Sequence, residues 1–109
     1  MTQLTSLGVD NLFTTAAFAG ATIKKIYVGT ASVDPADAST GSETVTGTFT
    51  LTGAAAGDIV LVIPPATLED DLIPKGAVCT ADTVTIYLYA NAAVDGAALT
   101  WTYIWFDVT

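Results

Sequence analysis

Histidine and arginine are both absent from this sequence of 109 residues, and its basic side chains number only three, all of them lysines. Without imidazole the chain lacks the usual proton shuttle near neutral pH, and without guanidinium it lacks the bidentate clamp for phosphate or carboxylate. Eleven Asp and Glu residues give a net charge of −8. A surface of this sign repels a phosphate backbone, so we expect no nucleic-acid partner.

Cysteine and long apolar runs are scarce as well. Cys79 is the sole cysteine, so no internal disulfide forms, and we expect its thiol to be a small core residue. The chain has no histidine that could activate this thiol or any serine, which argues against nucleophilic catalysis. No apolar run approaches the ~20 residues of a membrane-spanning helix. Residues 1–10, MTQLTSLGVD, lack the features of a signal peptide, so we expect synthesis in the cytoplasm and no membrane partner.

Charged residues make up only 13% of the chain, about half of the roughly 25% that is usual in soluble domains, while 51% of the residues are hydrophobic. A chain of this length forms one domain that buries about 65% of its unfolded surface. We therefore predict a single domain over residues 11–109, preceded by an extended arm over residues 1–10. The surplus of apolar and neutral surface favours oligomerisation or a partner.

Threonine is the most frequent residue of the sequence, valine and isoleucine are common, and these β-branched residues favour strands over helices. Residues 43–52, ETVTGTFTLT, alternate between apolar side chains and threonines, which predicts a strand with one buried and one solvated face. Residues 82–91 alternate in the same way, with Val84, Ile86 and Leu88 on the apolar side. Residues 98–108 predict a third strand, with Trp101 on one face and Phe106 on the other, and both faces require cover.

The stretch TGAAAGDIVLVIPP, residues 52–65, predicts a turn at residues 53–58 and then a strand at 59–63 that is apolar on both faces and covered on both. Two prolines end that strand, because proline cannot donate to the ladder. Further strands are expected at residues 12–18, 22–29 and 77–80, and loops at 31–42, 67–75 (with one helical turn around 68–72) and 91–96. The pattern predicts an all-β fold, an antiparallel β-sandwich or jelly-roll-like barrel of seven or eight strands, with the strand order left open.

Two acidic groups are candidates for chemistry. Glu69, Asp70 and Asp71 are adjacent, and paired carboxylates can hydrolyse glycosidic bonds, but neighbours in a polar loop point in different directions. Asp34, Asp37 and Glu43 could supply oxygens to calcium, yet their spacing lacks the alternation of an EF-type loop. GAAAGD precedes a strand and no lysine follows it, so it does not fit a phosphate loop. We therefore predict no catalytic residue, no metal and no cofactor.

The aromatic residues near the C-terminus carry a stronger signal. Tyrosine and tryptophan are favoured at interfaces because each combines a large apolar body with a polar group. Three roles remain open at this point: a subunit interface, the core of the sandwich, and a platform on which sugar rings stack. The residues concerned are Tyr87, Tyr89, Trp101, Tyr103 and Trp105.

Two motifs resemble those of a known group. Residues 53–65 follow the pattern G-A-x-x-G-D-x-V-x-V-x-P-P, and residues 81–85 read A-D-T-V-T with Asn91 shortly after. Together with the terminal aromatic strand, these motifs are similar to small structural proteins of tailed bacteriophages. The resemblance covers residues 42–109. It implies a virion protein without an active site, of the capsid decoration or cement type, which sits as a trimer on the outer capsid surface at local three-fold positions.

The expected partners are therefore the major capsid protein and two further copies of the chain. We place the capsid contact on the N-terminal arm and the subunit interface on the aromatic residues above; the arm residues are Thr2, Gln3, Leu4, Thr5 and Leu7. A head-fibre or tail-associated phage protein is the nearest variant. Two functions of other classes stay open: a carbohydrate-binding module that uses the same aromatic residues, and a hydrolase centred on residues 69–71.

Overall fold

The structure, a computed structural model, describes residues 17–18 and 21–108, and side chains from Ile23 onwards. Within these residues it is all-β, without a helix. The strands in chain order are β1 (Ala17–Phe18), β2 (Ala21–Val33), β3 (Glu43–Thr50), β4 (Ile59–Ile63), β5 (Leu72–Thr80), β6 (Thr83–Ala90) and β7 (Leu99–Val108).

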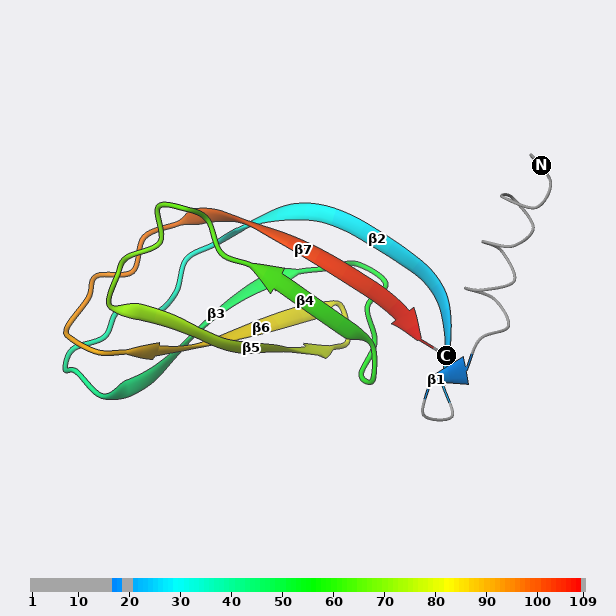
Figure 1. The fold of residues 1–109 in the computed structure, drawn as a ribbon, viewed down its shortest axis with the longest axis horizontal. Helices are drawn as coiled ribbons and strands as arrows, with labels where there is room; N and C mark the ends of the chain where they lie inside the picture. Colours follow the sequence, from blue (N-terminus) through cyan, green and yellow to red (C-terminus); the bar gives the residue numbers. More distant parts are fainter. Residues whose placement is uncertain (1–16, 19–20, 109) are drawn as a thin grey trace.

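The strands form two layers, visible in Figure 1 as β2, β7 and β4 above and β3, β6 and β5 below. All pairs are antiparallel, and β1 pairs only with the first two residues of β2. Six strands therefore build the sandwich in the described part of the chain, fewer than the seven or eight predicted. The sheets are not closed into a barrel, since no strand of one sheet pairs with a strand of the other among the described residues.

Most connections cross from one sheet to the other, and this gathers the loops at the two ends of the sandwich. Residues 34–42, 64–71 and 91–98 meet at one end, on the left of Figure 1. The turns of residues 51–58 and 81–82 lie at the other end, near the C-terminus. The hydrogen bonds from Leu51 N–H to the Asp82 carbonyl and from Asp82 N–H to the Ala54 carbonyl (both 2.9 Å) tie these two turns together.

The threonine strands fold as their alternation predicts. Along β3 the burial pattern alternates, with Val45 and Phe49 buried and the threonines exposed. On β6, Val84, Ile86 and Leu88 are fully buried. The core between the sheets is completed from the other layer by Val33, Val60, Trp101 and Trp105. The prediction of one buried face and one solvated threonine face is confirmed for β3, and that of a buried apolar side is confirmed for β6.

Two element boundaries were predicted wrongly. β2 continues through residues 31–33, which composition had assigned to a loop, because Val33 packs in the core and pairs with Leu99 of β7. β5 begins at Leu72 instead of residue 77 and includes Pro74, and residues 68–71 form a bend and a turn instead of the helical turn predicted around 68–72. The register shifts between Pro74, which lies opposite Leu88, and Gly76, which lies opposite Tyr87, and an irregularity of this kind on an edge strand accommodates a proline and a glycine.

Candidate interaction surface

In the sheet of β2, β7 and β4, alternate residues along each strand point to opposite faces. Trp101, Trp105 and Val60 point inward and are buried, and the residues between them in the sequence point outward. The outward residues line up in rows across three strands: Ile26, Phe106 and Ile59 form one row, and Val28, Ile104 and Leu61 form the next. Because side chains directly opposite on antiparallel strands lie ~5 Å apart, these rows form a continuous surface.

We call this surface the outer apolar face. Val28 is 71% exposed on it, and the three outward residues of β4 are each about half exposed, while Ile104 and Phe106 between them are partly buried. Large exposed apolar patches of several hundred Å² are uncommon on monomers and mark interaction sites. The face consists of Ile26, Val28, Ile59, Leu61, Ile63, Ile104 and Phe106.

Strand β4 was predicted to be covered on both faces, and this is corrected by the structure. Val60 and Val62 face the core, but the other face of β4 is open, with Leu61 53% exposed. No helix or loop lies over this side of the sheet in the described part of the chain (Figure 1). A strand that is apolar on both sides is thus buried on one side only.

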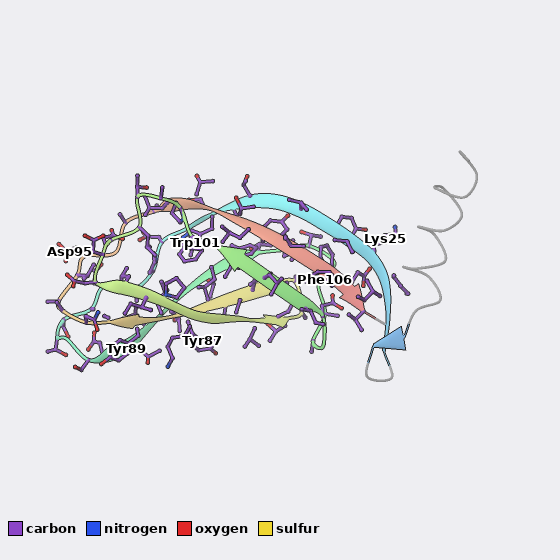
Figure 2. The ribbon with its side chains drawn as sticks, in the orientation of Figure 1. Lys25, Tyr87, Tyr89, Asp95, Trp101 and Phe106 are labelled. Carbon is purple, nitrogen blue, oxygen red and sulfur yellow. The ribbon has the colours of Figure 1, made fainter. Side chains whose placement is uncertain are left out.

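The seven residues of the outer apolar face carry no charge, although the exposed Lys24 lies two residues before Ile26 on β2. Towards the other end of the sheet, the outward positions of β2 and β7 carry hydroxyls: Ser32, Thr30, Thr100 and Thr102. The end of the sandwich formed by residues 34–42, 64–71 and 91–98 is called the loop end below. Of the ten Asp and Glu residues in 21–108, seven lie there: Asp34, Asp37, Glu43, Glu69, Asp70, Asp71 and Asp95. Figure 2 shows Asp95 at that end and Lys25 at the opposite end of the molecule.

The aromatic residues of the predicted subunit interface are not brought together. Trp101, labelled in Figure 2, and Trp105 are 1% and 7% exposed and belong to the core between the sheets. Tyr103 packs against the same core and stacks on Phe49, with ring centroids 5.4 Å apart. Tyr87 and Tyr89 lie on the outward, threonine-bearing face of β6 in the other sheet. Side chains buried inside one subunit cannot contact a neighbouring subunit or a sugar ring. Of the three roles considered, both tryptophans therefore have that of core residues.

The acidic candidates do not converge either. No group of three or more potential metal ligands occurs among the described residues. Glu43 accepts hydrogen bonds from Ser39 N–H and the Thr40 hydroxyl, both at 3.0 Å, and Asp37 accepts one from Gly96 N–H at 2.8 Å. These carboxylates order the loops in which they lie. The predicted capsid-contact residues Thr2, Gln3, Leu4, Thr5 and Leu7 fall outside the described residues.

Asp58 is the one buried carboxylate of the described chain, 8% exposed. Its Oδ2 accepts hydrogen bonds from Trp105 Nε1–H (3.0 Å) and Ala55 N–H (3.1 Å), and its Oδ1 accepts one from Val108 N–H (3.0 Å). Burial alone would raise the pKa of this carboxyl, but the three donors together hold the pKa below its ordinary value of 3.8. Asp58 therefore acts as a charged structural tie and not as an acid–base group.

This pKa gives a pH dependence of stability. Because the pKa of Asp58 is lower in the folded chain, its stabilising contribution is complete above 3.8 and is lost as the pH falls through the lowered value. Asp58→Asn cannot titrate. We expect the Tm difference between wild type and Asp58→Asn to be constant above about pH 5 and to shrink towards about pH 2.5 in thermal unfolding measurements. A difference that is unchanged over this range would contradict the assignment.

Cys79 lies in the core, as predicted, and is 6% exposed. Burial raises the pKa of its thiol, and the negative charge of Asp58 raises it further, which disfavours the reactive thiolate. Two shallow hollows of about 250 and 530 Å³ lie between the free edges of β4 and β5. Their titratable side chains are Asp58, already engaged by three donors, Lys75 and the protonated Cys79. This set supports no evident acid–base or nucleophilic step.

Comparison with known proteins gives no relative. No protein-family model, no curated protein and no solved structure matches the chain. No helix in the described residues has the length and hydropathy to cross a membrane. The outer apolar face was missed by sequence reasoning on β2, although Ile26 and Val28 are two residues apart and therefore share one face of the strand.

Proposed function

We propose that this chain is a non-enzymatic structural protein of a bacteriophage virion, a capsid decoration protein that binds the outer surface of the major capsid lattice as a homotrimer and stabilises the shell. The observation that carries the assembly role is the outer apolar face: seven apolar residues on three strands, without a charge among them. A protein whose largest uncovered feature is of this kind acts by burying surface.

The connectivity of the sheets supports the same proposal. The order β2-β7-β4 in one layer, with β1 beside β2, and β3-β6-β5 in the other is compatible with a jelly roll that lacks two of its eight strands. Jelly rolls are common in virus shells, although a fold by itself does not define a function. The specific capsid role comes from the motifs at residues 53–65 and 81–85, whose first residues, 53–58 and 81–82, form the two linked turns at one end of the sandwich.

The distribution of charge also fits a protein exposed on a shell. In this proposal the acidic loop end faces solvent, where like charges keep decorated particles apart and soluble. The affinity arises from several weak contacts made at once by a trimer, because each additional contact becomes intramolecular after the first has formed. The N-terminal arm, residues 1–10, supplies the contact with the capsid.

Co-sedimentation with empty phage capsids that lack their own decoration tests the proposal. We expect the full chain to pellet with capsids, to saturate at a fixed number of copies per capsid, and to raise the temperature at which the shell opens. The full-length double variant Leu4→Ser/Leu7→Ser should bind more weakly, because it removes apolar contacts from the arm. Failure to pellet with capsids from any of a panel of tailed phages would overturn the proposal.

A further inference from the structure

The outer apolar face has a definite size. Together with the flanking hydroxyl residues of β2 and β7, it spans three strands, at a spacing of ~4.8 Å, and about five to seven residues along each strand at ~3.3 Å per residue. Two such faces in contact remove on the order of 1,000 Å² from water in total, which is the lower limit for a stable protein–protein interface. The hydroxyl residues within this area supply a polar rim.

The charge of the chain decides between possible occupants. A basic partner would find no carboxylate to pair with on this face, since the acidic residues gather at the loop end of the sandwich. A second copy of the chain carries the same net charge of −8, and like charges oppose association wherever they are brought close together. The outer apolar face is an uncharged surface on which two copies can meet without that cost.

We infer that the outer apolar face of β2, β7 and β4 is buried against other copies of this chain and forms the interface between subunits. This inference rests on the proposed function only in its premise that the chain assembles. The outer apolar face takes the place of the aromatic residues of β7 as the contact between subunits. The inward tryptophans hold the sandwich together, and the outward residues of the same strand, Ile104 and Phe106, hold the subunits together.

A charge placed in the centre of the face tests this inference. Leu61 is on the middle row, paired with Ile104, and is 53% exposed, so glutamate can replace it without entering the core. In the assembly the new carboxylate would be buried without a partner and would face its own copies. We expect wild type at micromolar concentration to sediment at a multiple of 11.2 kDa, and Leu61→Glu to sediment as the 11.2 kDa monomer.

Val78→Glu is the matched control. Val78 is 51% exposed on a strand and pairs with Thr85, but it lies on the outward face of the other sheet. It should leave the wild-type mass unchanged. Val28→Lys, which alters a different strand of the face, should reproduce the monomer. Near-ultraviolet circular dichroism of the buried tryptophans confirms that each variant is folded.

The outcomes separate this inference from the proposed function. A monomeric wild type, or a Leu61→Glu variant that is folded and keeps the wild-type mass, would overturn the inference whatever the capsid assay gives. An oligomer that dissociates on Leu61→Glu supports it even if wild type fails to pellet with capsids, in which case the proposed function alone is wrong. If Val78→Glu also sediments as the monomer, any added charge dissociates the assembly, and the result would contradict the assignment of the outer apolar face as the interface.

Discussion

We expect Asp58→Ala to lower the free energy of unfolding by about 3 kcal/mol, because it leaves three N–H groups without their acceptor. Two of these donors belong to the backbone, at Ala55 and Val108, and the third is the indole of Trp105. The carboxylate bridges the turn before β4 and the end of β7, which lies 50 residues further along the chain. Its removal therefore loosens the tie between two strands of one sheet as well as the turn.

Chemical denaturation measures this loss, and two variants bracket it. Asp58→Asn keeps one acceptor oxygen but turns an amide N–H₂ towards the donors, so we expect a smaller cost of about 2 kcal/mol. Asp70→Ala removes an exposed carboxylate from the loop at the other end of the sandwich, and should stay within about 0.5 kcal/mol of wild type. A cost below about 1 kcal/mol for Asp58→Ala would show that water replaces the lost acceptor.

The local part of this site was predictable and the distant part was not. Glycines beside Asp58 predict a turn, and Gly53 and Gly57 do adopt positive φ angles of 93° and 97°. A hydrogen bond from Asp58 to its own turn follows from the same sequence, and Ala55 donates it. The bonds from residues 105 and 108 depend on the pairing of β4 with β7, which alternation within either strand does not specify.

The strands were predictable where their two faces differ. On β3 the alternation of threonine with apolar residues fixes both the strand and its orientation. On β5 the proline and glycine at residues 74 and 76 indicate a loop, and only the register shift in the pairing with β6 keeps them in a strand. Composition therefore failed where tertiary pairing overrides a local signal. Closure of the sheets and the number of strands are likewise properties of pairing.

The outer apolar face shows a further limit of sequence. Residues 59–63 reveal that both faces of β4 are apolar, but not which face the fold leaves open. For β7 the same reasoning assigned large aromatic residues to a contact between subunits, because tryptophan is frequent in interfaces. The structure places Trp101 and Trp105 inside and the smaller Ile104 on the outer side. The preference of tryptophan for interfaces therefore pointed to the inward face of β7. The contact that we infer lies on the outward face, where the exposed rows of aliphatic residues are.

We expect the largest loss of stability from Trp101→Ala, about 4 kcal/mol, because it leaves a cavity in the centre of the sandwich. Trp101 is the largest of the fully buried side chains and shares the core with Val33, Ile86 and Leu88. Domains of this size have a total stability of about 5–15 kcal/mol, so the variant should be close to unfolding at 37 °C. The variant and wild type are compared at one protein concentration, since assembly adds to the apparent stability.

The variant Trp101→Phe separates the effect of the cavity on stability from the effect of the polar indole N–H. Trp101 Nε1 is buried and has no hydrogen-bond partner among the residues that the structure describes. Phenylalanine keeps most of the apolar volume and removes this unpaired donor, so we expect it to cost only about 1–2 kcal/mol. Equal losses for the two variants would mean that the indole N–H has an acceptor after all. Because we expect Trp101→Ala to bring the domain close to unfolding, a loss of sugar binding in that variant would reflect damage to the core. A sugar platform is tested instead by Tyr87→Ala, on the surface of β6.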